Sequence, residues 1–247
     1  MEFAWLIPAF SFAGFLLIVL SGRLFPDKGA TISIVAGAAG FGMFWVVLWG
    51  YLAADVSSMN CAHIFGQKTC FFNLEWFEAG NTIFRWGIML DPLSLVMLGM
   101  VTVVGLMIQV YSIEYMKGGP RFGWYFAVFS LFMASMLALI VADNFLILYI
   151  VWELVGLCSF LLIGFWFERG AAVEAAKKAF ITTRIGDVGL LLGILLLFAE
   201  VGTFDMSTIF QAVSAGDIGQ GKVTIAALLI FLGAMGKSAQ FPLHVWL

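Results

Sequence analysis

The sequence predicts an all-α protein, a polytopic bundle of about seven transmembrane helices. Of its 247 residues, 63% are hydrophobic and only 11% carry a charge, and the mean hydropathy is +1.06. Soluble domains rarely have such a composition. Apolar stretches long enough to cross about 30 Å of hydrocarbon also recur along the whole chain. Together these observations indicate an integral membrane protein rather than a soluble enzyme or binding domain.

The expected spans follow one another closely along the chain. We place them at residues 3–20, 31–54, 91–113, 122–141, 145–167, 179–199 and 223–247. The first lacks a basic N-terminal region, so we expect it to persist as a membrane anchor and not as a cleaved signal peptide. Asp91 and Pro92 should open the third span, as a side-chain cap followed by a residue without an amide hydrogen. The tight connection at 142–144 should make the fourth and fifth helices antiparallel neighbours.

Basic residues are distributed unevenly among the connections. Those after the first, third and fifth spans contain Arg23, Lys28, Lys117, Arg121, Arg169, Lys177 and Lys178. The other side has only Lys68, Arg85 and Lys222, which lie in longer segments. Because short cytoplasmic loops carry the excess of Lys and Arg, this pattern predicts an external N-terminus.

The long segment after the second span contains a hairpin pattern and two cysteines. Between residues 71 and 90, two runs rich in aromatic and β-branched residues flank Ala79-Gly80-Asn81, which predicts a small outer β-hairpin. Cys61 and Cys70 fall on the side expected to be oxidising, where a disulfide and two free thiols are both compatible with the sequence. His63 lies between them, but two thiols and one imidazole leave a zinc tetrahedron one ligand short. We therefore expect no metal site.

Two charged residues within the apolar runs are the main functional candidates. Lys237 lies in the stretch 223–247, which has no acidic residue. An ammonium group near the bilayer centre costs about 2.5–3.5 kcal/mol on insertion scales, so it marks a functional site by default. Glu153, in the fifth span, is the natural partner, although the helical rise places the two at different depths, about 12 and 21 Å below the outer surface. Two alternatives remain: a neutral, hydrogen-bonded Glu153, and a Lys237 that snorkels to the interface.

Three further ionisable residues are supporting candidates for proton transfer. Arg184 and Asp187 stand three apart in the sixth span, on one helix face, which predicts an intrahelical ion pair. A structural pair, a pair that sets the field around Lys237 and a pair that contacts a partner subunit are all compatible with this position. Pro242 should break the seventh helix near Lys237, because it lacks an amide hydrogen and clashes with the preceding turn. His244, just beyond, is compatible both with proton transfer and with a packing hydrogen bond.

Five stretches of this sequence together resemble the largest antiporter-like subunit, subunit L, of proton-pumping NADH:quinone oxidoreductase, which is respiratory complex I. They are Leu90-Asp91-Pro92-Leu93-Ser94, Ala142-Asp143-Asn144, Trp152 to Ser159, Thr183 to Asp187, and Gly236 to Leu243. The resemblance covers essentially the whole chain. The tryptophan-glutamate-x-x-glycine and glycine-lysine-serine-x-x-x-proline patterns are similar across a wider superfamily, which includes Mrp-type antiporters and membrane-bound hydrogenase subunits.

The resemblance implies a fold, a site and a set of partners. Glu153 and Lys237 would be the pair that sets protonation in one half-channel. The chain would be a single membrane domain, 1–247, in which residues 1–113 precede the first inverted repeat and residues 122–247 begin it. Because the family has two such repeats, we expect a truncated or N-terminal piece. The implied partners are other antiporter-like subunits, small membrane subunits, lipids and protons, but no nucleic acid.

The implied function is proton translocation coupled to quinone reduction, in the bacterial inner membrane in preference to an organellar one. The chain would then be an enzyme only as a subunit of a translocase. Its cysteine spacing and the lack of a dinucleotide-binding glycine pattern predict no cofactor in this chain, so flavin, iron–sulfur clusters and quinone are expected in partner subunits. The alternatives are an Mrp-type cation/proton antiporter or membrane-bound hydrogenase subunit, and a non-conducting scaffold in which buried charges lock helices together.

Overall fold

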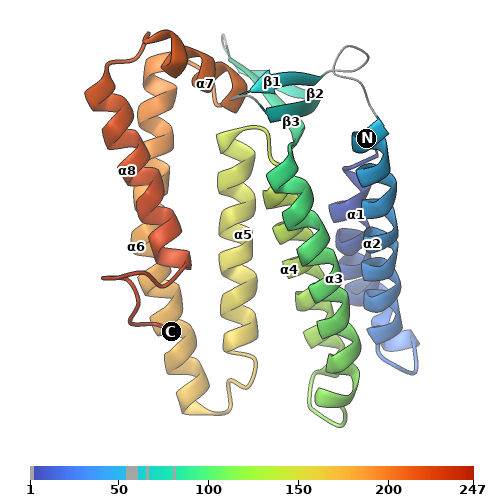
Figure 1. The fold of residues 1–247 in the computed structure, drawn as a ribbon. Coiled ribbons are helices and arrows are strands. Elements are labelled where there is room, and N and C mark those ends of the chain that lie inside the picture. The colour runs from blue at the N-terminus through green and yellow to red at the C-terminus, as the bar shows by residue number, and fades with distance from the viewer. Residues whose placement is uncertain (1–2, 54–60, 65–66, 80–81) are drawn as a thin grey trace. The chain divides into compact units, whose positions relative to one another are not determined.

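The structure, a computed structural model, describes residues 3–53, 61–64, 67–79 and 82–247 (Figure 1). The chain divides into two compact units. One consists of Met1–Phe72 and Ile88–Ala142, and the other of Asn73–Gly87 and Asp143–Leu247. Long helices make up most of each unit, as the composition predicts, and a small sheet is the only strand structure in the described part of the chain.

The first unit contains four long helices that follow the first four expected spans. They are α1 (Leu6–Ser21), α2 (Ala30–Ala53), α3 (Pro92–Tyr115) and α4 (Phe122–Val141), with a short 3-10 turn, η1 (Gly22–Leu24), after α1. Helix α1 packs against α2 and α4, and α3 packs against α2 and α4. The predicted cap of α3 is confirmed: Asp91 Oδ1 accepts a hydrogen bond of 2.7 Å from the Ser94 amide, and Ser94 Oγ accepts one of 2.8 Å from the Asp91 amide.

Interhelical hydrogen bonds satisfy polar side chains inside the first unit. The hydroxyl oxygens of Ser33 on α2 and Ser130 on α4 form a 2.8 Å hydrogen bond, and Gln109 Nε2 on α3 donates a 2.9 Å hydrogen bond to Ser33 Oγ. All three residues are buried. Such contacts hold transmembrane helices together, because their polar groups have no water to bind.

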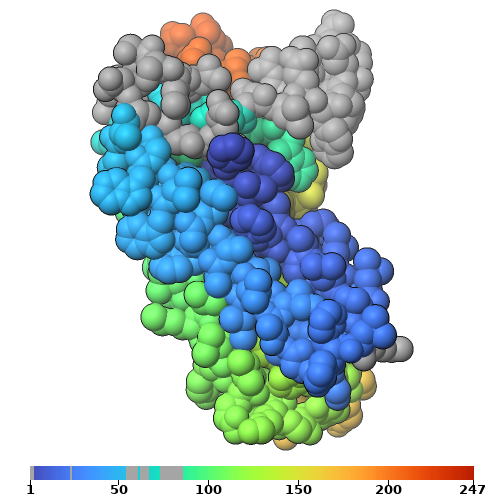
Figure 2. All heavy atoms as spheres, turned by 90° about the vertical axis from the view of Figure 1, so that its right-hand side faces the viewer, coloured from blue at the N-terminus to red at the C-terminus, as the bar shows by residue number. Residues whose placement is uncertain are grey.

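The exterior of the helices is apolar. Figure 2 shows the face formed by α1 and α2. Large apolar side chains of these two helices, such as Leu20, Val35 and Trp49, are exposed. Among the described residues, five helices are able to cross a membrane by length and composition: α2, α3, α4, α5 (Phe145–Ile163) and α6 (Gly170–Val201). Helix α1 is a shorter apolar helix. The chain is therefore a multi-pass membrane protein.

The small sheet has three strands in the order β1-β2-β3, namely β1 (Cys61–Ile64), β2 (Gln67–Ala79) and β3 (Thr82–Leu90). Strands β2 and β3 occupy the predicted hairpin, while its turn residues Gly80 and Asn81 lie outside the described residues, as does the side chain of His63. The sequence did not predict β1. It pairs antiparallel with β2 so that Cys61 faces Cys70, and the two cysteines form a disulfide. Among the described residues, no cluster of ligands suits a metal ion.

The second unit contains α5, α6, a short helix α7 (Met206–Ala215) and α8 (Gln220–Lys237). Two segments differ from the expected connectors. Most of the segment 168–178 is not a connector but the first turns of α6, because its alanine-rich sequence favours a helix. The connector at 202–222 contains α7, which starts after Asp205 and ends at Gly216 in the left-handed conformation (φ 81°) that commonly terminates helices.

The expected break in the last helix lies directly after Lys237. Helix α8 ends there, five residues before Pro242, and the chain continues in turns. Trp246 Nε1 donates a 3.0 Å hydrogen bond to the carbonyl oxygen of Gly236, which the end of the helix leaves without an intrahelical partner. Helices α6 and α8 approach closely at Gly186, where a Cβ atom would lie only 2.8 Å from the carbonyl oxygen of Leu232. This close approach places Lys237 beside α6.

Candidate functional site

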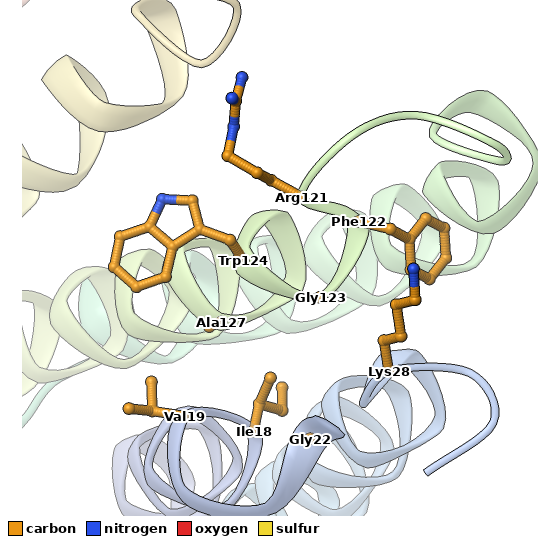
Figure 3. Close-up of a pocket in the computed structure, with 9 residues that line it drawn as sticks. All are labelled: Ile18, Val19, Gly22, Lys28, Arg121, Phe122, Gly123, Trp124 and Ala127. Atoms are coloured by element: carbon orange, nitrogen blue, oxygen red, sulfur yellow. The ribbon is translucent and has the colours of Figure 1, made fainter. Parts of the chain in front are cut away.

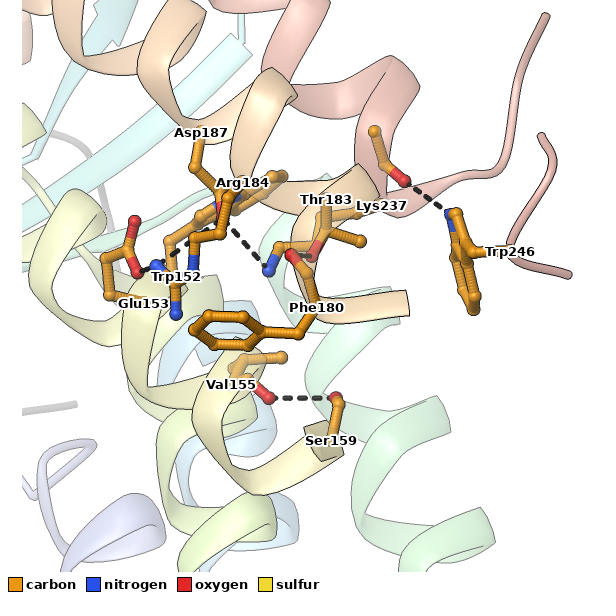
Figure 4. Close-up of polar contacts among 11 residues, drawn as sticks. Trp152, Glu153, Val155, Ser159, Phe180, Thr183, Arg184, Asp187, Lys237 and Trp246 are labelled. Carbon is orange, nitrogen blue, oxygen red and sulfur yellow. Dashed lines mark hydrogen bonds and ion pairs between the residues drawn. The ribbon is translucent and has the colours of Figure 1, made fainter. Parts of the chain in front are cut away.

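The ionisable residues that the sequence places within the bilayer meet inside the second unit (Figure 4). Helix α5 contributes Glu153, α6 contributes Arg184 and Asp187, and the C-terminal end of α8 contributes Lys237. The four side chains carry two formal negative and two formal positive charges. Their arrangement in space decides which of them act on one another.

Asp187 is the centre of this group. Its side chain is only 1% exposed. One carboxylate oxygen, Oδ1, accepts a 2.6 Å hydrogen bond from the indole Nε1 of Trp152 on α5. The other, Oδ2, lies 3.5 Å from Lys237 Nζ and 3.6 Å from Arg184 Nη1. Two cations therefore share one carboxylate oxygen at nearly equal distances, so neither of them holds it alone.

Arg184 connects this centre to Glu153. Its guanidinium group forms an ion pair with Glu153 Oε2 and also lies over the ring of Phe180, 4.4 Å from the ring centroid. Arg184 and Glu153 are each about a quarter to a third exposed, at 30% and 24%. The charges thus alternate in the order Glu153, Arg184, Asp187, Lys237.

In the described part of the chain, Glu153 and Lys237 do not form a direct ion pair, because their charged atoms lie more than 4.0 Å apart. The sequence left direct pairing open, because the helical rise predicted a depth difference of about 9 Å. Arg184 and Asp187 bridge the two residues. The predicted intrahelical pair is present, and it lies between the two main candidates instead of beside them.

Gly156 and Trp152 shape the position of Lys237. A Cβ atom on Gly156 would lie 2.7 Å from Lys237 Nζ and 3.5 Å from Arg184 Nη2, so only glycine leaves room for the ammonium here. The ammonium also lies 5.7 Å from the centroid of the Trp152 ring, a cation–π distance. Both residues belong to the tryptophan-glutamate-x-x-glycine pattern, but the sequence predicted no role for either. Their spacing of four, which puts them on one face of α5 beside Glu153, was the available signal.

His244 lies apart from this group. Its side chain is exposed, and its ring lies 5.6 Å from that of Phe241. Within the described residues, His244 forms neither a hydrogen bond nor an ion pair with Lys237 or Asp187. The structure therefore brings together four of the five candidate residues.

A second buried carboxyl group lies in the connection before α5, outside the membrane-spanning segments. Asp143 is 2% exposed, and its burial raises its pKa from 3.8 to about 6. Asn144 Nδ2 donates to Asp143 Oδ1 over 2.9 Å, and the Met206 amide donates to the Asp143 carbonyl over 3.2 Å. Asn144 also caps α5, since its Oδ1 accepts a 2.8 Å hydrogen bond from the Ile147 amide. These contacts fix the start of α5, which carries Glu153.

Comparison with known proteins identifies two family matches. Residues 142–247 match the transmembrane family of the NADH:quinone oxidoreductase and Mrp antiporters. Residues 76–126 match the N-terminal region of chain 5 of NADH-ubiquinone oxidoreductase, complex I. The first match contains all the residues of the charged group.

Individual relatives align over the whole chain. NAD(P)H-quinone oxidoreductase chain 5 of a Picosynechococcus species is 38% identical over 100% of this chain and 37% of its own length. F(420)H(2) dehydrogenase subunit L of Methanosarcina mazei is 42% identical, with the same coverage. Among solved structures, the Mrp complex from a Dietzia species matches with a TM-score of 0.78 and 27% identity, covering 99% of this chain and 24% of that one. The chain thus spans a little over a third of the length of these two relatives.

Proposed function

Because this chain belongs to the antiporter-like subunits of the NADH:quinone oxidoreductase and Mrp antiporter family, and matches their N-terminal part, we propose that it carries part of a proton path through the membrane. The observation that supports this proposal is the alternating row Glu153, Arg184, Asp187, Lys237 inside one unit. Ionisable residues buried in transmembrane helices mark proton and ion pathways.

The geometry suggests how a proton at one end of the row acts on the other end. When Glu153 takes up a proton, it loses its charge and holds Arg184 less tightly. Arg184 is then free to pair more fully with Asp187, whose Oδ2 it already shares with Lys237. A lysine that loses its carboxylate partner in a desolvated site favours its neutral form, so Lys237 releases a proton. Uptake at Glu153 and release at Lys237 would thus be linked by charge alone.

The chemistry that drives this path would come from other subunits. We propose that the chain works in a complex with other antiporter-like subunits and with small membrane subunits, as the names of its relatives suggest. Flavin, iron–sulfur clusters and quinone would be held by those partners. The chain would then belong to a translocase without carrying a redox centre itself. We also propose that it lies in the bacterial inner membrane, and the distribution of Lys and Arg supports an external N-terminus.

The test is Lys237→Met in the assembled complex, reconstituted into proteoliposomes. Proton uptake and quinone reduction are measured together while NADH is oxidised. The expected result is fewer protons moved per NADH, because the methionine cannot carry a charge. The matched control is Lys177→Met, since Lys177 is exposed and pairs with Glu174 at 2.9 Å on the surface. An unchanged ratio of protons to NADH in the Lys237 variant would favour the scaffold alternative, in which the charges only hold helices together.

A second function deserves a test because a solved Mrp complex, 27% identical to this chain, has the same fold. In that case the same four residues would exchange protons for sodium or another cation without redox chemistry. The two functions differ in their driving force. If the chain belongs to an antiporter, a sodium gradient without NADH should change the pH inside the proteoliposomes. If it belongs to a redox-driven pump, the internal pH should not change.

A further inference from the structure

A cavity of about 500 Å³ lies in the first unit, between the end of α1 and the start of α4 (Figure 3). Its lining combines two kinds of side chain. Ile18, Val19 and Ala127 form an apolar part, in which α1 faces α4. Lys28 and Arg121 are basic, and Figure 3 shows them on opposite sides of the first turn of α4. The remaining lining residues are Gly22, Phe122, Gly123 and Trp124.

The backbone around this cavity is held in a specific arrangement. A Cβ atom on Gly123 would lie 2.5 Å from the carbonyl oxygen of Lys28, so the loop before α2 packs directly on the start of α4. Lys28 and Arg121 both have left-handed backbone conformations, with φ of 49° and 61°. Such conformations are uncommon for residues other than glycine, and they cluster where a side chain has to be presented to a ligand.

The neighbouring acid does not neutralise Lys28. The Asp27 carboxylate accepts hydrogen bonds from the backbone amides of Thr31 and Gly29, at 2.5 and 3.3 Å. Hydrogen bonding to Thr31 lowers the pKa of Asp27, which therefore stays ionised at the start of α2. No ion pair joins Asp27 to Lys28 among the residues that the structure describes. Lys28 thus presents its positive charge to the cavity.

The position of the cavity relative to the helices indicates its ligand. Ile18, Val19 and Ala127 belong to the apolar helices, whereas Lys28 and Arg121 lie where those helices end. The ends of membrane-spanning helices lie near the boundary between the hydrocarbon and the phosphate layer of a bilayer. Trp124, which is 45% exposed, is a residue typical of that boundary. Basic pockets between transmembrane helices bind lipid head groups.

We propose that this cavity binds one anionic phospholipid. Its phosphate lies at the first turn of α4, where Lys28 and Arg121 reach it from either side, and an acyl chain covers Ile18, Val19 and Ala127. A free phosphate ion shares the charge but leaves this apolar wall without a partner, so the lipid is the ligand that fits both parts. The proposal is independent of the proton path, because every residue in it belongs to the first unit.

The test uses phosphatidylglycerol that carries a photoactivatable group on an acyl chain. The assembled complex is placed in nanodiscs of phosphatidylcholine with a small fraction of this probe, and labelled peptides are mapped after illumination. We expect labelling of the peptide that contains Ile18 and of the peptide that contains Ala127. Each basic residue near a membrane surface contributes about fivefold to the binding of an anionic lipid, so Lys28→Gln with Arg121→Gln should lower the labelling at least about tenfold.

Two comparisons separate this site from general attraction to the surface. The control pair Lys117→Gln with Lys177→Gln removes the same two charges from exposed surface ion pairs and should leave labelling unchanged. The charge-preserving pair Lys28→Arg with Arg121→Lys should keep most of it. The proposal is overturned if a phosphatidylcholine probe labels the same peptides equally, if the control pair loses as much labelling, or if millimolar inorganic phosphate displaces the lipid probe.

Discussion

The ammonium of Lys237 lies 3.5 Å from Oδ2 of Asp187, and that same oxygen lies 3.6 Å from the guanidinium of Arg184. A carboxylate shared between two cations is sensitive to the charge on either side of it. Since Asp187 is almost fully buried, water does not screen these interactions. In the proposed proton path, Asp187 is the residue through which Glu153 and Lys237 would act on each other, so its replacement is the most direct test of the row.

Asp187→Asn should uncouple the two ends of the row. The asparagine keeps an oxygen for the Trp152 indole but loses the charge that Lys237 and Arg184 share. Breaking a buried ion pair on one side costs about 3–5 kcal/mol, so we also expect a lower melting temperature. Proton translocation in proteoliposomes should be largely lost. Glu174→Gln, which removes an exposed acid from the same helix, is the control, and equal translocation in both variants would contradict the shared-carboxylate arrangement.

Gly156→Ala should displace Lys237 without unfolding the helices. The added methyl group would lie 2.7 Å from Lys237 Nζ, the far end of a flexible side chain, which is able to move away. In a helix, alanine is more favourable than glycine by up to about 1 kcal/mol, so the thermal stability should change little. Translocation should fall, because the ammonium leaves Asp187. Gly42→Ala, at a helical position with nothing within 4 Å of the new methyl group, should leave translocation intact.

The sequence predicted the five described helices that are long enough to cross a membrane and the break near Lys237, but not the order of the charges. Apolar length fixes where a helix crosses the membrane, and the proline indicated an end to α8 near Lys237. Helical rise gives the depth of Glu153 and Lys237 but not the rotation of their helices about their axes. That rotation depends on packing, such as the close approach of α6 and α8 at Gly186. The rotation of the helices brings Asp187 close to Lys237, and Glu153 pairs with Arg184 instead.

In the connections between the helices, too, the sequence predicted only part of the structure. The aromatic and β-branched runs predicted β2 and β3, whereas β1 is only four residues long and has no alternation to reveal it. Helix α7 lies between Asp205 and Gly216 in a segment that the sequence predicted only as a connector, because its ten residues are too few for a span. In contrast, the Met206 amide that donates to the Asp143 carbonyl lies about 60 positions further along the chain, so this contact depends on tertiary structure.

Thiol counting tests the disulfide between Cys61 and Cys70. The chain has three cysteines, and the structure leaves the buried Cys158 outside the disulfide. Alkylation of the denatured, unreduced protein should therefore modify one thiol, and alkylation after reduction should modify three. Replacing both Cys61 and Cys70 by serine should lower the stability by about 2 kcal/mol, near the low end for disulfides, because the closed loop is short. Three labelled thiols without reduction would contradict this linkage.

Asp143 should make stability depend on pH in mildly acidic solution. In the unfolded chain its carboxyl group titrates near 3.8, and in the folded protein burial raises its pKa to about 6. The folded state therefore binds the proton more tightly than the unfolded state, and the stabilisation present below pH 3.8 is lost as the pH rises to about 6. By linkage, a shift of this size corresponds to at most about 3 kcal/mol.

Asp143→Asn removes this titration while keeping an acceptor for the neighbouring amide of Asn144. The melting temperature of the variant should therefore change less between pH 4 and 7 than that of the wild type, and should exceed it at pH 7. Asp217→Asn, an exposed acid near the start of α8, should retain the wild-type slope. An Asp143→Asn variant with the wild-type slope would mean that Asp143 is ionised in the folded protein. Its carboxylate would then be stabilised by more than the hydrogen bonds that the structure shows around it.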